Sequence, residues 1–75
     1  MNRINDWKGL LKIANEDLAL YGYALEITDE NDPGFFECNI LKDGEFVEGY
    51  AENYYEDELS GLVNDAWYYV KSELV

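Results

Sequence analysis

The chain has 75 residues, and its 17 Asp and Glu against five Lys and Arg give a formal net charge of −12. This length predicts one small domain over residues 1–75, because below about 70–80 residues a single core rarely supplies more than about 3–5 kcal/mol. Hydrophobic residues make up 48% of the chain and aromatic residues 16%, which excludes a disordered acidic tail. The net charge excludes direct binding to nucleic acid or to an anionic membrane, and it favours basic protein partners.

The residue types argue against an enzyme. The chain has no His, so His-based catalysis and His metal sites are excluded. The one Cys, Cys38, lies in an alternating apolar run typical of a buried hydrophobe. Asp29, Asn31 and Gly34 fit an EF-hand loop, but Pro33 and Ile40 occupy positions that need ligands, which favours a solvated turn. We therefore expect no catalytic residue, no cofactor and no metal.

Signals for export and membrane insertion are also missing from the sequence. There is no run of 18 apolar residues and no basic-then-apolar leader. A single Cys forbids an internal disulfide and suits a reducing compartment. We expect a cytoplasmic protein of a bacterial host cell.

Residues 3–21 have the apolar spacing of an amphipathic helix. Asn2 is a suitable N-cap, and Gly22 stands where a left-handed C-cap glycine is expected. The apolar stripe recurs at steps of three and four residues and consists of Ile4, Trp7, Leu11, Ala14, Leu18 and Tyr21.

Three strands are predicted next, over residues 23–28, 35–41 and 45–51. The pair Asp43-Gly44 is a strong signal for a two-residue hairpin, which would set Leu41 opposite Phe46 and Ile40 opposite Val47. Alternation then assigns a core face made of Phe36, Cys38, Ile40, Val47 and Ala51. The other face carries Phe35, Glu37, Leu41, Phe46, Glu48 and Tyr50.

Residues 54–74 read as a closing helix, with Asn53 and Glu56 as a capping box. Its buried stripe comprises Leu59, Leu62, Val63, Ala66, Val70 and Leu74. The predicted fold class is α+β, in the order α-β-β-β-α, with a three-stranded antiparallel meander and two flanking helices on one face. An alternative places the first helix on the face that carries the acids.

The charge is unevenly distributed along the chain. Residues 1–15 carry Arg3, Lys8 and Lys12 against Asp6, whereas the other 60 residues hold sixteen acids against two Lys. We expect the basic first helix to pair with the acidic remainder. The acids then concentrate on the hairpin tip, the exposed sheet face and the helix start at Glu56-Asp57-Glu58. Acids in a first helical turn also complement the helix dipole, so a purely structural role for that triplet stays open.

Several fragments resemble a known family. They are Lys42-Asp43-Gly44-Glu45-Phe46-Val47, Ala51-Glu52-Asn53 before an acidic helix start, Trp67, Ile4-Asn5-Asp6 and Lys71-Ser72-Glu73-Leu74. Together they resemble the small acidic type II anti-CRISPR proteins of phages.

The resemblance implies a DNA mimic that fills the groove in which a guide-RNA-directed nuclease reads its PAM with arginines. It also implies contact through Asp43, Gly44 and Glu45 at the hairpin tip. The chain departs from the family in ending with one long helix, and in placing Lys42 beside the tip.

We therefore expect an inhibitor that mimics nucleic-acid charge and blocks the nucleic-acid-binding groove of a bacterial nuclease. Its partner would be a basic nucleic-acid-binding protein such as a CRISPR nuclease, and its own state a monomer or a small homo-oligomer. Tyr55 is a further candidate aromatic anchor. The predicted partner-binding residues are Glu37, Asp43, Gly44, Glu45, Phe46, Glu48, Tyr50, Glu52, Tyr54, Glu56, Asp57 and Glu58. The alternatives are an immunity protein or antitoxin that neutralises a basic toxin, and a small structural or adaptor domain.

Overall fold

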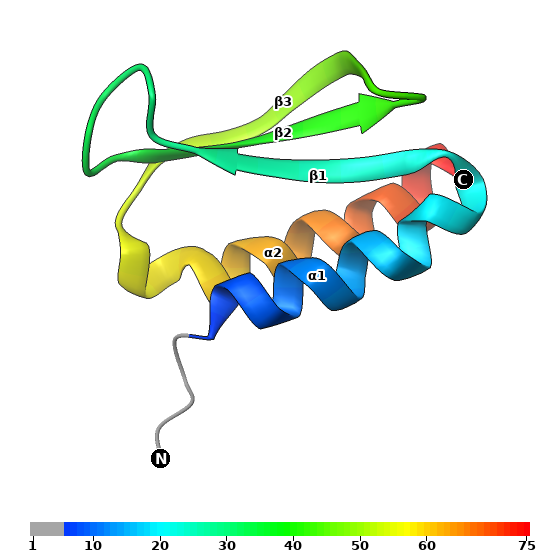
Figure 1. Cartoon of the computed structure of the whole chain (residues 1–75), viewed down its shortest axis with the longest axis horizontal. Coiled ribbons are helices and arrows are strands. Elements are labelled where there is room, and N and C mark those ends of the chain that lie inside the picture. Colours follow the sequence, from blue (N-terminus) through cyan, green and yellow to red (C-terminus); the bar gives the residue numbers. More distant parts are fainter. Residues whose placement is uncertain (1–5) are drawn as a thin grey trace.

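The computed structural model describes residues 6–75 as two layers, with both helices on one face of the sheet (Figure 1). The elements are α1 (Trp7–Leu18), the 3-10 helix η1 (Ala19–Tyr21), β1 (Tyr23–Thr28), β2 (Phe36–Lys42), β3 (Glu45–Tyr54), the 3-10 helix η2 (Glu56–Glu58), α2 (Leu59–Tyr69) and the π-helical end η3 (Val70–Leu74). The sheet is antiparallel with the order β1-β2-β3. The predicted α-β-β-β-α order is confirmed, and the alternative with α1 on the opposite face is wrong.

The first helix begins where a side chain caps it. The Asp6 carboxylate accepts a hydrogen bond from the backbone N–H of Gly9 at 3.1 Å, so α1 starts at Trp7. The expected cap at Asn2 and the expected helical residues 3–5 lie outside the described residues. The predicted end is confirmed, because Gly22 adopts a φ of 84° that favours glycine.

The core lies between the helix layer and the sheet. Burial of its apolar side chains is the main source of stability. It consists of Trp7, Ala14, Leu18, Leu25, Cys38, Ile40, Leu59, Leu62, Val63, Ala66 and Val70. Cys38 is fully buried as expected, and burial raises the pKa of its thiol to about 12.

An amide side chain joins α1 to the edge of the sheet. The Asn15 side chain accepts a hydrogen bond from the backbone N–H of Leu25 at 2.7 Å and donates one to its carbonyl at 3.1 Å. These bonds satisfy the backbone N–H and carbonyl of Leu25 on the outer edge of β1. Left free, such groups could pair with a strand of another molecule.

The pairing of β2 with β3 departs from the predicted register. Leu41 does face Phe46, but Ile40 faces Glu48. The strand β3 has ten residues and β2 has seven, and the pairing accommodates this difference through three register shifts. A bulge adds a residue to one strand and moves the side chains that follow it. Val47 is therefore 45% exposed, and its assignment to the core was wrong.

The same shifts turn two predicted surface residues toward the helices. The Tyr69 hydroxyl donates a hydrogen bond to the Glu48 carboxylate at 2.8 Å, and this bond raises the pKa of Tyr69. The rings of Tyr50 and Tyr69 lie 5.2 Å apart. Glu48 and Tyr50 thus face α2, and their assignment to the open sheet face was wrong.

The closing helix starts later than predicted. Because Tyr54 pairs with Phe36, the backbone of Asn53 and Tyr54 belongs to β3, and the predicted cap at Asn53 was wrong. Helical structure begins at Glu56, where the Glu58 carboxylate accepts a hydrogen bond from the Tyr55 backbone N–H at 2.9 Å. The side chains of residues 53 and 54 are outside the described part of the chain.

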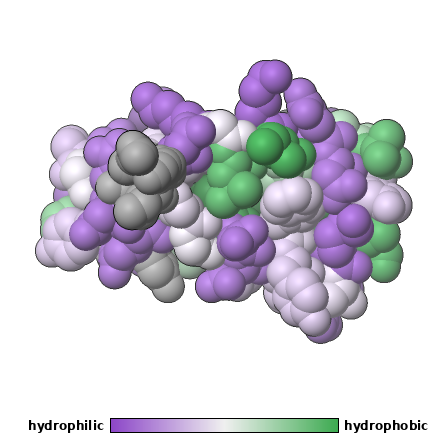
Figure 2. Space-filling model, turned by 90° about the horizontal axis from the view of Figure 1, so that it is seen from below, coloured by the Kyte–Doolittle hydropathy of each residue, from purple (hydrophilic) through white to green (hydrophobic). Residues whose placement is uncertain are grey.

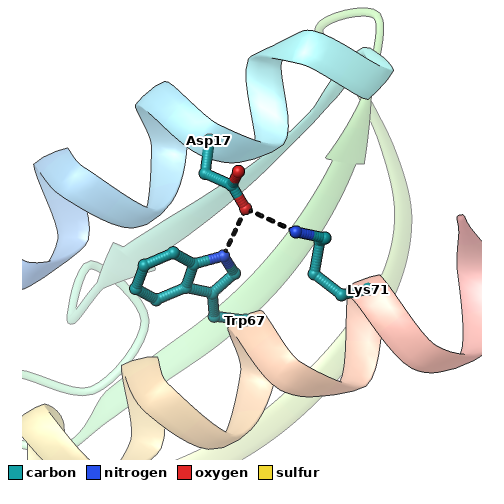
Figure 3. Close-up of polar contacts among 3 residues, drawn as sticks. All are labelled: Asp17, Trp67 and Lys71. Carbon is teal, nitrogen blue, oxygen red and sulfur yellow. Dashed lines mark hydrogen bonds and ion pairs between the residues drawn. The ribbon is translucent and has the colours of Figure 1, made fainter.

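One carboxylate links the two helices (Figure 3). An oxygen of Asp17 accepts a hydrogen bond from the Trp67 indole at 2.8 Å and pairs with the Lys71 ammonium at 3.0 Å. The hydrogen bond from Trp67, followed by the contact with Lys71, holds the pKa of Asp17 below its ordinary value. Among the described bases of residues 6–15, Lys12 pairs with Glu16, an acid one turn further along the same helix. The described ion pairs do not join these bases to an acid on another element.

We predict that Ile40→Ala and Val47→Ala differ sharply in stability. Ile40 is fully buried, so its truncation should cost about 2–5 kcal/mol and leave so small a domain largely unfolded. Val47 is largely solvated, so its truncation should cost within about 0.5 kcal/mol. Urea unfolding followed by circular dichroism measures both. Equal losses would contradict the bulged register.

We predict that Asp17→Asn lowers the melting temperature at neutral pH. Because folding lowers the pKa of Asp17, its contribution is fully present above the ordinary value of 3.8 and is lost as the pH falls below it. The difference from the wild type should therefore shrink below pH 3.8. Glu16→Gln, at an exposed pair on the same helix, is the control and should show a smaller effect. A difference that does not change with pH would contradict this role.

Candidate protein-binding surface

Two acidic connections lie at the same end of the sheet. Figure 1 shows the β1–β2 connection and the β3–α2 connection at this end, away from the hairpin. A ring contact of 4.9 Å between Phe35 and Tyr55 joins them. We call residues 29–35 and 55–58 the acidic end. It holds six carboxylates, from Asp29, Glu30, Asp32, Glu56, Asp57 and Glu58.

Three of these carboxylates help to shape the surface. Asp29 accepts a hydrogen bond from the Gly34 backbone N–H at 3.2 Å, which closes the β1–β2 connection. Glu56 accepts one from the Trp7 indole at 3.2 Å, and Glu58 accepts the bond from Tyr55 given above. The Trp7 ring also meets Phe36 edge-on at 5.9 Å, so the acidic end rests on the core.

The other three carboxylates are available to a partner. Glu30, Asp32 and Asp57 are exposed, and their side chains form no hydrogen bond or ion pair within residues 6–75. The two ion pairs found in that part of the chain involve Lys12 and Lys71 and lie on the helix layer. Tyr55, which joins the two connections through Phe35, is 57% exposed. Unpaired acids around an aromatic side chain suit Lys and Arg of another protein.

The open face of the sheet is more polar than expected. The Asn39 side chain donates a hydrogen bond to Glu26 at 3.1 Å, and the Asn31 side chain donates one to Glu37 at 2.6 Å. A shallow depression of about 280 Å³ lies at the bulged pairing of β2 and β3, where Gly49 faces Asn39 without a side chain. Its lining residues are Asn39, Gly49, Tyr50, Ala51 and Glu52.

The hairpin forms as predicted at the other end of the sheet (Figure 1). Asp43 and Gly44 have φ values of 53° and 84°, and positive φ at both positions is what a type I′ turn requires. The Lys42 ammonium donates to the Tyr21 carbonyl at 3.0 Å and lies 4.6 Å from the Tyr23 ring centre. This cation is thus directed toward the α1–β1 turn.

The structure divides the predicted binding residues into separate groups. Asp43, Gly44, Glu45 and Phe46 lie at the hairpin, whereas Glu56, Asp57 and Glu58 lie at the acidic end. Glu37 and Glu52 belong to the strands between these ends, while Glu48 and Tyr50 face α2. The side chain of Tyr54 lies outside the described part of the chain.

Sequence reasoning missed the acids of the β1–β2 connection. Asp29, Glu30 and Asp32 were interpreted as a solvated turn because they fail as a calcium loop. The signal that could have found them is the aromatic Phe35 directly after this acidic run, matched by Tyr55 directly before the second one. Their contact requires the strands to bring both connections to one end.

The described residues 6–75 hold neither a cluster suited to a metal ion nor a helix suited to span a membrane. No group of three or more His, Cys, Asp and Glu side chains is placed to hold a metal ion there. None of the helices in that range combines the length and apolar character needed to cross a bilayer.

Comparison of the chain with protein-family models, with curated proteins and with solved structures found no match.

We predict that neutralising the three available carboxylates stabilises the fold. Glu30→Gln, Asp32→Asn and Asp57→Asn together remove like charges that repel one another and break no described hydrogen bond. The melting temperature should rise at 20 mM salt, and the gain should shrink at 500 mM, where the screening length is only a few ångströms. The control is Asp29→Asn, Glu56→Gln and Glu58→Gln, which removes the same charge but weakens structural bonds. A lower melting temperature for the first triple variant would contradict the assignment of these acids as unpaired.

Proposed function

We propose that the protein is an acidic inhibitor that occupies the nucleic-acid-binding surface of a basic bacterial protein inside the host cell. The supporting observation is that Glu30, Asp32 and Asp57 are unpaired in the two connections that the Phe35–Tyr55 contact joins. A guide-RNA-directed nuclease, which reads DNA with arginines, is the target class that the sequence resemblance favours.

The mechanism would be competition without turnover. Carboxylates of the acidic end would pair with Lys and Arg side chains that otherwise hold phosphates, so inhibitor and nucleic acid would exclude each other. The net charge of −12 would raise the association rate with a basic target. Tyr55, exposed yet held by Phe35, would supply the apolar contact that slows dissociation.

The hairpin would make a secondary contact. Its acids, Asp43 and Glu45, are fewer than those of the acidic end and neighbour a lysine. Because β2 has seven residues, the two ends are separated by about 20 Å of strand. A target that engages both ends would need a basic groove at least that long.

Competition binding tests this proposal. A guide-loaded type II nuclease is titrated with fluorescent duplex DNA in the presence of the protein, and DNA release is followed by anisotropy. We predict inhibition that weakens as salt rises from 100 to 500 mM, because exposed charge pairs are screened. Unchanged DNA binding at saturating protein would refute this target class.

Two charge-reversal variants locate the contact. Glu30→Lys with Asp57→Lys and Asp43→Lys with Glu45→Lys change the net charge equally. Because Asp43 has a φ of 53°, which Lys disfavours, melting temperatures check that both variants stay folded. The first should weaken inhibition at least tenfold, equivalent to about 1.4 kcal/mol, and the second should weaken it less. The reverse ranking would assign the main contact to the hairpin tip.

A further inference from the structure

The outer side of the helix layer differs in chemistry from the rest of the molecule. We call the side chains of α1, η1, α2 and η3 that point away from the sheet the helix face, which is the side seen in Figure 2. Figure 2 shows hydrophobic side chains near the middle of this face and at its right-hand end, between hydrophilic ones. The helix layer includes Ile13, Leu20, Trp67, Tyr68 and Lys71.

Three large apolar side chains of the helix layer are mostly exposed. Ile13 is 55% exposed, Leu20 78% and Tyr68 74%. Ile13 lies on α1, offset from its buried stripe, and Leu20 lies in η1, which follows α1 directly. On α2, a shallow hollow of about 270 Å³ is lined by Asn64, Trp67, Tyr68 and Lys71.

The charges of the helices nearly balance. Both ion pairs found among the described residues lie in this layer, Lys12 with Glu16 and Lys71 with Asp17. Together with Lys8, Asp65 and Glu73, the charged side chains of α1, η1, α2 and η3 sum to −1, on a chain whose net charge is −12. A basic partner is therefore drawn to the acidic end, where the field is strong. A second molecule of the same charge meets the least repulsion on the helix face.

We propose that a second copy of this chain docks on the helix face to form a two-fold symmetric dimer. The two halves of the face complement each other, since Ile13 and Leu20 of one copy can enter the hollow beside Trp67 and Tyr68 of the other, and the two-fold axis repeats the contact. The dimer leaves the acidic end and the open sheet face uncovered, and so it presents two acidic ends.

The helix face suits a small, weak interface. A standard interface takes about 800 Å² from each partner, roughly one-sixth of the 4741 Å² surface of this chain. The molecule extends 31 × 29 × 18 Å along its principal axes. Because Figure 1 looks down the shortest axis with the two layers stacked across the view, the helix face spans the 31 Å and 18 Å directions. Repulsion between two charges of −12 opposes association, so the dimer should tighten when salt screens it. Binding to a basic partner has the opposite dependence on salt.

Sedimentation equilibrium of the full chain tests the dimer. We expect a monomer–dimer equilibrium between 10 µM and 1 mM protein, with a dissociation constant at least threefold lower at 500 mM NaCl than at 50 mM. Ile13→Glu with Leu20→Glu should weaken dimerisation at least tenfold at either salt. Both side chains are exposed, so the variant should stay folded, and circular dichroism checks this.

The matched control is Phe46→Glu with Val47→Glu on β3. These side chains are 64% and 45% exposed, and the variant gains the same two charges far from the helix face. It should dimerise as the wild type does. A monomer at 1 mM protein in both salts would overturn the proposal. Equal weakening by both double variants would also overturn it, because general repulsion would then explain the loss.

Discussion

The shortage of positive charge constrains everything else in this molecule. Seventeen carboxylates share five bases, so the placement of each base decides which surface is neutral and which is not. Lys12 and Lys71 are used in ion pairs on the helix layer, and Lys42 contacts the turn before β1. Within residues 6–75 this leaves the acidic end without an ion pair. Because the paired bases lie on the helix layer, the negative charge of the acidic end is not offset by a base paired with it in that part of the chain.

The layers are held together by polar contacts around the apolar core. Asp17 joins α1 to α2, Asn15 joins α1 to β1, and the bond from Tyr69 to Glu48 joins α2 to β3. Each of these bonds lies at the border of the core, where one partner retains access to water and desolvation costs little. The described residues include eleven buried apolar side chains, which is a small core. The polar contacts around it fix how the helices and strands are oriented, and they add stability.

The two broad surfaces suit different partners. The acidic end has unpaired carboxylates and an aromatic side chain. It is the surface proposed to bind a basic protein, and that binding should weaken as salt rises. The helix face has apolar side chains among nearly balanced charges. It is the surface proposed to bind a second copy of the chain, and that dimer should tighten as salt rises. Because the surfaces lie on different sides of the molecule, both proposed contacts can exist at once.

The order of elements followed from sequence because its signals are local. The apolar stripes, the glycine at position 22 and the Asp43-Gly44 turn depend on neighbours only a few residues away. The structure confirms the glycine, the turn and most of both stripes. In the first stripe Tyr21 is 40% exposed, contrary to prediction, and Ile4 lies outside the described residues. The positions of Val47, Glu48 and Tyr50 did not follow, because a bulge depends on how two strands of unequal length are fitted against α2. The start of the second helix was missed for a similar reason, since Tyr54 pairs with a strand residue far away in the chain.

The sequence by itself thus determined the net charge, the α-β-β-β-α order and the acidic runs. Only the tertiary structure decided which acids lie together. Asp29–Asp32 and Glu56–Glu58 are more than twenty residues apart, and they meet because the two strand ends and the Phe35–Tyr55 contact bring them to one end. Net charge depends only on which residues are present. A binding surface depends on which residues lie close together, and for residues remote in the chain this is set by the packing of the fold.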